Sequence, residues 1–223
     1  LLLPVSEFRI KTSLCPLCPL WFKANGEIMN STQLAELESL VSPGAVLSDE
    51  DALMVYECDA YVAAKRRPQV VVLPSSTEEV ARVIQFARRH ELIVVPRGAG
   101  TGLAGGTLTE TDSIMLVLSR MNQILEVDIP NRRALVEAGV VNLHLTQLVT
   151  PAGFCFAPDP SSQAACTIGG NIAANSGGPH TLKMGVTVNH TLAVEMVTPE
   201  GDIVWLGGGD ENGAVEGAPG YDL

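Results

Sequence analysis

The residues that could do chemistry in this chain are concentrated in two glycine-rich stretches about sixty residues apart. The first runs from Pro96 to Thr107 and follows the strand-like residues 92–95. The second begins with the corner Pro158–Ser162 and continues over residues 167–178. Glycine permits positive φ angles and lets a ligand approach the main chain, and successive N–H groups in such turns bind anions. Two such turns and a serine-bearing corner indicate a long ligand with a diphosphate in its middle.

The spacing of the first stretch separates it from two common phosphate-binding loops. A P-loop requires a lysine directly after its last glycine, and no lysine follows here. A Rossmann fingerprint requires Gly-x-Gly-x-x-Gly at the start of a helix, whereas Gly98, Gly100 and Gly102 alternate. A structural glycine turn without a ligand is the remaining alternative. The second stretch argues against it, because twelve residues with four glycines and two asparagines are costly to order without a role.

The composition is that of a globular protein and excludes several classes of function. Apolar residues make up 46% and charged residues 17% of the 223 residues, which argues against disorder. The net charge of −11 repels a nucleic-acid backbone, so no nucleic-acid partner is expected. The same charge means that backbone N–H groups and local dipoles must hold any bound diphosphate. No metal site is predicted, because the Cys15–Cys18 pair has no second pair to complete a zinc ligand set.

Cysteine usage and hydropathy bear on the compartment. Five cysteines without regular spacing are typical of a reduced, intracellular protein. The apolar run over residues 14–22 is too short to cross a bilayer. We therefore expect a cytoplasmic protein, and any association with the inner membrane would be peripheral and made through partners.

Hydrophobic periodicity predicts the elements that must position the two stretches. A strand over 69–73, a helix opened by Ser76 and Glu79, and a strand over 92–95 form a β-α-β unit. This unit places the first stretch at the carboxyl end of a strand, where α/β sheets bind ligands. The other predicted elements are a helix capped by Ser31 or Thr32, strands over 114–118, 124–127 and 134–136, a helix capped by Asn142 and ending at Val149, a turn and short helix within 167–178, and a hairpin over 192–206.

Three segments are expected along the chain. Residues 1–28 are interpreted as a tail or non-native upstream segment, because prolines interrupt any helix there. Residues 29–68 form a helical lead-in, and residues 69–223 form the ligand-binding domain. A loop is expected over 207–218, and residues 219–223 resemble a loop entering a helix. We therefore expect a fragment of a longer protein, whose binding domain is incomplete at its C-terminus.

Together these motifs resemble the FAD-binding domain of the vanillyl-alcohol oxidase and p-cresol methylhydroxylase (PCMH) type. Three segments carry the resemblance, Arg97–Gly102, Pro158–Ser162 and Thr167–Asn175, and residues 183–187 and 194–201 extend it. Within that family the chain is most similar to the branch with the flavin subunit of bacterial glycolate oxidase and the D-lactate and D-2-hydroxyglutarate dehydrogenases. The resemblance implies an α+β fold of two small α/β subdomains with FAD between them.

The resemblance also implies which residues bind the cofactor. The first loop would wrap the pyrophosphate, the corner would line the flavin end or the nearby phosphate, and the second cluster would run close to the isoalloxazine and ribityl groups. The segment around 194–197 would carry the adenine side. The candidate cofactor-binding residues are Pro96, Arg97, Gly98, Ala99, Gly100, Thr101, Gly102, Pro158, Asp159, Pro160, Ser161, Ser162, Thr167, Gly169, Gly170, Asn171, Ala173, Asn175, Gly178 and Val197.

The same resemblance bears on attachment and on catalysis. No histidine lies in the first loop, where covalent members attach the flavin, so non-covalent FAD is expected. Catalytic residues are left unassigned, because family members place them in a second domain and a C-terminal segment that would follow residue 223. His180 is interpreted as a structural or supporting residue, and Asp159 as a carboxylate that stabilises its turn.

The implied activity is FAD-dependent oxidation of a 2-hydroxy acid such as glycolate or D-lactate. Its implied partners are that small-molecule substrate, an electron acceptor and companion subunits of a glycolate oxidase-like complex. The chain alone is expected to bind FAD weakly and to turn over nothing. Two alternatives stay open: a flavoenzyme of the same fold such as UDP-N-acetylenolpyruvoylglucosamine reductase, and a non-catalytic scaffold subunit, which would have no need of intact glycine motifs.

Overall fold

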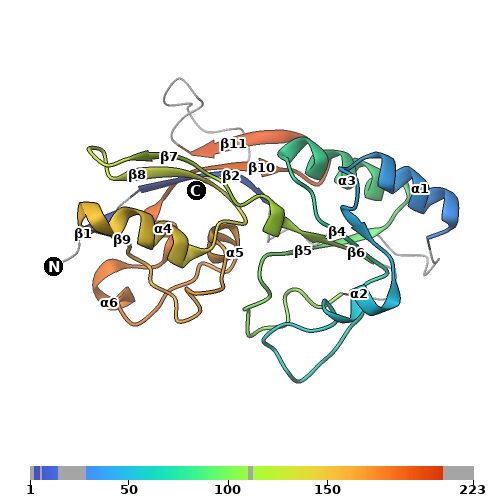
Figure 1. The fold of residues 1–223 in the computed structure, drawn as a ribbon, viewed down its shortest axis with the longest axis horizontal. Helices are drawn as coiled ribbons and strands as arrows, with labels where there is room; N and C mark the ends of the chain where they lie inside the picture. The colour runs from blue at the N-terminus through green and yellow to red at the C-terminus, as the bar shows by residue number, and fades with distance from the viewer. Residues whose placement is uncertain (1–2, 6, 15–28, 110–112, 208–223) are drawn as a thin grey trace. The chain divides into compact units, whose positions relative to one another are not determined.

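The computed structural model describes residues 3–5, 7–14, 29–109 and 113–207. The chain divides into two compact units, each built around its own sheet (Figure 1). Unit 1 comprises Leu1–Leu14, Met121–Met196 and Val204–Leu223, and unit 2 comprises Cys15–Arg120 and Val197–Ile203. The Cys15–Cys18 pair, the loop expected beyond residue 207 and the chain end that resembles a helix entry lie outside the described residues.

Unit 2 holds a four-stranded sheet in the order β3-β4-β6-β5. The last three strands are parallel, and β3 is antiparallel to β4. The predicted β-α-β unit is present, but β6 lies between its two strands. The elements of this unit are α1 (Ser31–Ser39), β3 (Val46–Leu47), α2 (Glu50–Met54), β4 (Val70–Val72), α3 (Thr77–Arg89), β5 (Ile93–Arg97), β6 (Ser113–Val117) and a 3₁₀ turn (Leu118–Arg120).

Helix α3 follows its predicted pattern closely. The Ser76 hydroxyl caps it by accepting the Glu79 amide at 3.3 Å. The predicted apolar face is buried, and Arg82, Arg88 and Arg89 are exposed.

The Glu79 carboxylate is also a link between segments. It accepts hydrogen bonds from the amides and hydroxyls of Ser42 and Ser75. Burial raises its pKa, but these four hydrogen bonds outweigh burial and lower the pKa below its ordinary value. The carboxylate thereby fixes the start of α3 to the loop that follows α1.

Both faces of the unit 2 sheet are covered by helices. Val71 and Met115 pack with Leu53 of α2 on one face. Because side chains alternate along a strand, Val70 and Ile114 point to the opposite face, on which α3 lies (Figure 1). All of these side chains are buried, so β5 belongs to a closely packed sheet that holds the loop at its carboxyl end.

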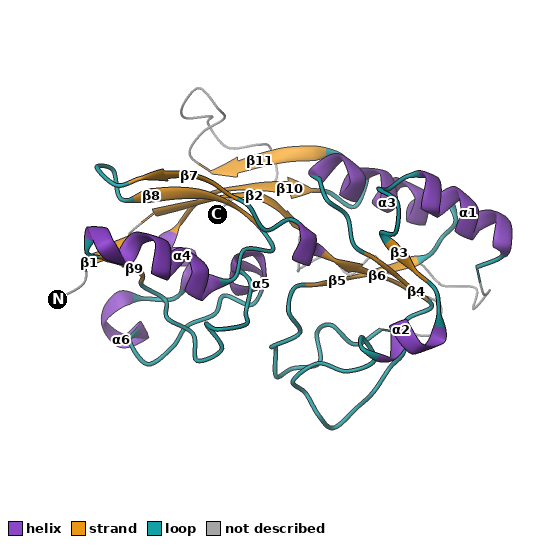
Figure 2. Ribbon diagram, viewed as in Figure 1, coloured by secondary structure: helices purple, strands orange, loops and turns teal. Residues whose placement is uncertain are grey.

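Unit 1 holds a five-stranded sheet in the order β11-β10-β2-β8-β7 and a separate β1-β9 pair. The predicted strands over 124–127 and 134–136 correspond to β7 and β8, which pair antiparallel, and β2 runs parallel to β8. Helices α4 and α5 lie along one face of the sheet (Figure 2). The elements are β1 (Leu3–Val5), β2 (Glu7–Leu14), β7 (Ile124–Asp128), β8 (Arg133–Glu137), α4 (Asn142–Val149), a 3₁₀ turn (Thr150–Ala152), β9 (Phe154–Phe156), α5 (Ile168–Ala173), α6 (Thr181–Met184), a 3₁₀ turn (Thr187–His190), β10 (Thr191–Val197) and β11 (Ile203–Gly207).

Two predicted helix caps were wrong. Helix α1 is capped by Asn30, which forms a reciprocal capping box with Gln33, rather than by Ser31 or Thr32. Helix α4 is capped by Val141 without a side-chain bond. Asn142 is instead its first residue, and the nitrogen and oxygen of its buried side-chain amide have no hydrogen-bond partner among the described residues. Neighbouring polar residues compete for one cap, and tertiary packing decides between them.

Strands β1 and β2 lie within residues 1–28, where prolines led us to expect no regular structure. Residues 29–68 form part of unit 2, since β3 pairs with β4. In the described part of the chain, no helix has both the length and the apolar character needed to cross a membrane.

Candidate functional site

The first glycine stretch is a loop that leaves the carboxyl end of β5. Gly100 adopts a φ of +70°, and its carbonyl accepts the Ala60 amide at 2.9 Å. A Cβ atom on Gly100 would lie 2.2 Å from Nη2 of Arg97. The backbone conformation therefore favours glycine at this position, and any side chain there would have to displace the Arg97 guanidinium.

Gly102 and Gly106 of the same loop are glycines for another reason. A Cβ atom at either position would meet no protein atom within 4 Å. Neighbouring packing thus leaves room for a side chain there, and its absence opens the main chain to approach from outside. This is the arrangement that a diphosphate bound by backbone N–H groups requires, so the residues of the loop fit such a group.

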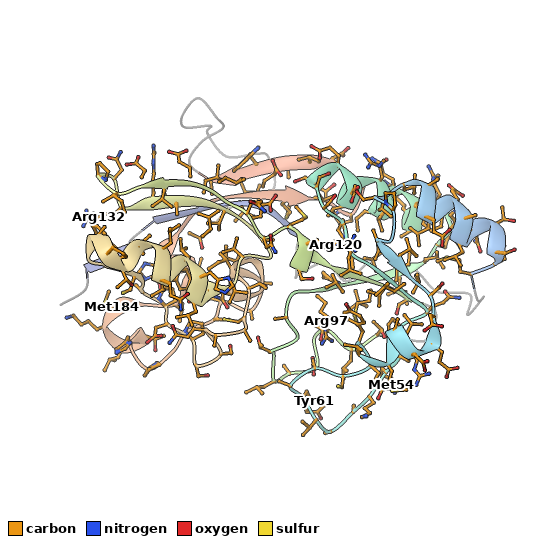
Figure 3. The ribbon with its side chains drawn as sticks, in the orientation of Figure 1. Met54, Tyr61, Arg97, Arg120, Arg132 and Met184 are labelled. Carbon is orange, nitrogen blue, oxygen red and sulfur yellow. The ribbon has the colours of Figure 1, made fainter. Side chains whose placement is uncertain are left out.

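Arg97 ends β5 and turns its half-buried side chain toward the loops of unit 2 (Figure 3). Its Nη1 donates to the Cys58 carbonyl at 2.8 Å and to the Thr107 hydroxyl at 3.4 Å. The Thr107 hydroxyl in turn donates to Asp59 at 2.9 Å. The guanidinium also lies 5.8 Å from the centroid of the Tyr56 ring. Burial lowers the pKa of Arg97, and Asp59 opposes that shift.

The Pro158–Ser162 corner of unit 1 is built around a strained residue. Asp159 has a φ of +43°, a conformation that is uncommon outside glycine. Its carboxylate lies 2.7 Å from Nδ1 of His180. The backbone of Gly178 passes so close that a Cβ atom there would lie 1.6 Å from the Asp159 carbonyl oxygen. Strain of this kind is frequent at binding sites, where the surrounding structure holds it in place.

The second cluster continues from this corner into α5. Thr167 caps the helix by accepting the Gly170 amide at 3.3 Å. A Cβ atom on Gly169 would lie 2.7 Å from the Cβ atom of Ala138, so this glycine serves close packing inside unit 1. Asn171 is buried, and its Nδ2 has no oxygen or nitrogen partner among the described residues.

Each unit therefore gathers one part of the predicted site. Residues 96–102 lie together at the end of β5 in unit 2. The corner, α5 and the loop that follows it lie together in unit 1, where Ala173, Asn175 and Gly178 succeed the buried part of α5. Val197, at the end of β10, is 1% exposed, so its side chain contributes to the core. Contact of these residues with a cofactor stays a prediction.

Sequence reasoning missed the segment that supports the first loop. Cys58, Asp59 and Ala60 all bond to the glycine stretch or to its neighbours, although they lie about forty residues earlier. Their spacing carries no motif, and they fall within the segment 29–68 that was interpreted as a helical lead-in. Residues brought together by tertiary folding alone leave no local pattern.

The cysteines of unit 1 are not prepared for nucleophilic chemistry. Burial raises the pKa of the Cys155 thiol, and the nearby Asp159 adds to that shift. Burial likewise raises the pKa of Cys166, outweighing hydrogen bonds from Ser162 and Asn171. A reactive cysteine needs the opposite shift. Among the described residues, no group of three histidine, cysteine or acidic side chains has the arrangement of a metal site.

Comparison with known proteins gives consistent matches. The profile of a family described as FAD binding domain matches residues 68–207. Glycolate oxidase subunit GlcD of Escherichia coli K12 is 41% identical over 197 residues, which are 88% of this chain and 38% of that protein. D-lactate dehydrogenase of Anaerostipes hadrus is 39% identical over 146 residues, which are 66% of this chain and 30% of that protein. The chain thus spans about two fifths or less of these relatives.

Solved structures give the same result for the fold. An alkyldihydroxyacetonephosphate synthase superposes with a TM-score of 0.71 at 24% identity, covering 84% of this chain and 37% of that one. The predicted α+β fold of PCMH type, with two small units of mixed helix and sheet, is confirmed.

Proposed function

We propose that this chain, which belongs to the family of FAD binding domains, holds the diphosphate of its FAD cofactor with the backbone of residues 98–102. The observation that carries the proposal is a glycine loop at the carboxyl end of β5 whose main chain is open to approach at Gly102. Hydrogen bonds between amides and phosphate oxygens each contribute about 1.5–3 kcal/mol, so a few of them suffice for tight binding. In a chain of net charge −11, backbone amides supply attraction without a cluster of cations.

The unit 1 residues named above are the proposed contacts for the rest of the cofactor. Ser161 and Ser162 offer hydroxyl donors beside the Asp159–His180 pair, which holds the corner in shape. Val197 is buried, so we assign any contact near the adenine to the backbone of its segment. The absence of histidine from residues 96–107 supports non-covalent attachment.

We further propose that the full-length protein oxidises a 2-hydroxy acid such as glycolate or D-lactate. The proposal is supported by the similarity to a glycolate oxidase subunit and to a D-lactate dehydrogenase. When bound, FAD supplies the hydride acceptor for such an oxidation. The residues of this chain would bind and orient that cofactor, while the substrate groups would be held elsewhere in the full-length protein. Companion subunits, an electron acceptor and a cytoplasmic location peripheral to the inner membrane belong to the same proposal.

The test is the visible spectrum of the purified full-length protein, followed by anaerobic addition of glycolate or D-lactate. We expect flavin absorption bands that bleach with one of these acids, and flavin that acid precipitation releases wholly into the supernatant. A spectrum without flavin bands would favour a scaffold subunit. Flavin that no 2-hydroxy acid reduces would favour another flavoenzyme of the same fold.

A further inference from the structure

The first glycine loop is tied to the Cys58–Ala60 segment at two points. Arg97 makes one tie, through its hydrogen bond to the Cys58 carbonyl. The Gly100 carbonyl makes the other by accepting the Ala60 amide. Figure 3 shows the Arg97 side chain among the loops of unit 2, away from the outer edge that Tyr61 marks. The Arg97 side chain thus supports the loop through hydrogen bonds to other protein groups.

We propose that Arg97 is a positioning residue, which fixes the glycine loop on the Cys58–Ala60 segment in the conformation that receives a diphosphate. The proposal rests on the proposed function, and it goes further by assigning the shape of the loop to one side chain. The backbone would still make the contacts with the phosphate oxygens.

The guanidinium is well suited to this role because several groups fix its orientation. Nη1 is held by a carbonyl and by the Thr107 hydroxyl, and Thr107 is itself fixed by Asp59. Nη2 occupies the space that a Cβ atom on Gly100 would fill. The planar guanidinium can donate hydrogen bonds in several fixed directions at once, whereas a lysine ammonium is a single point charge on a flexible chain. The position of the Arg97 guanidinium therefore depends on the absence of a side chain at Gly100.

Electrostatics supports the same assignment. Burial disfavours the charged guanidinium, and Asp59 compensates only in part, as the lowered pKa of Arg97 indicates. An anion brought to the loop would supply the missing compensation. The arrangement thus favours a bound diphosphate over an empty loop, even though Arg97 is committed to protein partners.

The experiment compares Arg97→Lys and Arg97→Gln in the full-length protein. We expect both variants to bind FAD at least about tenfold more weakly, because lysine lacks the planar fork that donates in several directions and glutamine lacks the charge. We also expect faster hydrogen exchange at the Ala60 amide in the FAD-free protein, because its acceptor Gly100 is no longer held. Thr107→Val, which removes the link to Asp59, should change both quantities in the same direction by a smaller factor.

Arg120 provides a matched control in the same unit. Its Nη2 donates to the Gly44 carbonyl at 3.0 Å, so it also joins a guanidinium to a distant backbone carbonyl. Arg120→Lys and Arg120→Gln should leave the dissociation constant of FAD and the exchange of Ala60 unchanged.

Two results would overturn the role of Arg97. The first is unchanged exchange at Ala60 in both Arg97 variants. The second is wild-type affinity for FAD in Arg97→Lys, which would show that charge alone matters. A wild-type protein that binds no FAD would instead contradict the proposed function, and the exchange of Ala60 would still report on the tie itself.

Discussion

Replacing Gly100 by valine is expected to abolish retention of FAD by the full-length protein while its helix content stays nearly unchanged. The backbone at this position has a φ of +70°, which disfavours any branched side chain by about 1–2 kcal/mol. The new Cβ atom would also displace the Arg97 guanidinium, so the hydrogen bonds by which it supports the loop would be lost. The measurement is flavin content after purification, together with circular dichroism.

Gly44 gives a control that separates strain from position. It lies in the same unit with a φ of +72°, but a Cβ atom there would meet nothing within 4 Å. Gly44→Val should therefore lose some stability to backbone strain and retain its flavin. Normal flavin occupancy in Gly100→Val would contradict the assignment of the loop.

Replacing Gly178 by alanine is expected to displace the Pro158–Ser162 corner. The added Cβ atom would lie 1.6 Å from the Asp159 carbonyl oxygen, and neither backbone segment can yield as a flexible side chain would. Overpacking of this kind destabilises proteins by about 1–3 kcal/mol, which lowers the melting temperature by about 2–4 °C for each kcal/mol. We also expect weaker FAD binding, because the corner is a proposed cofactor contact. Thermal unfolding and fluorescence titration with FAD measure the two effects.

Gly153→Ala is the corresponding control in unit 1. Its φ of +84° strains an alanine, but the site offers open space for the Cβ atom. Its loss of stability should come from backbone strain alone, and its affinity for FAD should equal that of the wild type. A Gly178→Ala protein that melts and binds like this control would show that the corner tolerates displacement.

Local pattern was enough to predict much of the fold. The strand-helix-strand run from β4 to β5 was evident, since the two strands are continuous apolar runs, the apolar residues between them repeat with helical period, and Ser76 marks the start of α3. The position of β6 between β4 and β5 was not evident, because the order of strands in a sheet depends on contacts between distant segments. The same reason explains why β2 was missed: its pairing with β8 lies more than a hundred residues away in sequence.

The candidate site likewise has a part that local sequence predicts and a part that depends on tertiary contacts. Gly100 and Arg97 were both selected from sequence, because glycine at close spacing after a strand is a local signal. The guanidinium lies beside Gly100 and donates to the Cys58 carbonyl only because the chain folds. No local sequence pattern indicates these contacts. Gly169 was selected as a position for close ligand approach, whereas the structure explains it by close packing on Ala138. One residue type serves both purposes, so sequence alone could not separate them.

The most direct measurement is a crystal structure of the full-length protein with FAD bound. We predict phosphate oxygens of the cofactor at hydrogen-bond distance, about 2.7–3.2 Å, from amide nitrogens of residues 98–102, with the Arg97 guanidinium still on the Cys58 carbonyl. A diphosphate held by other residues, with no phosphate oxygen bonded to this loop, would contradict the central claim.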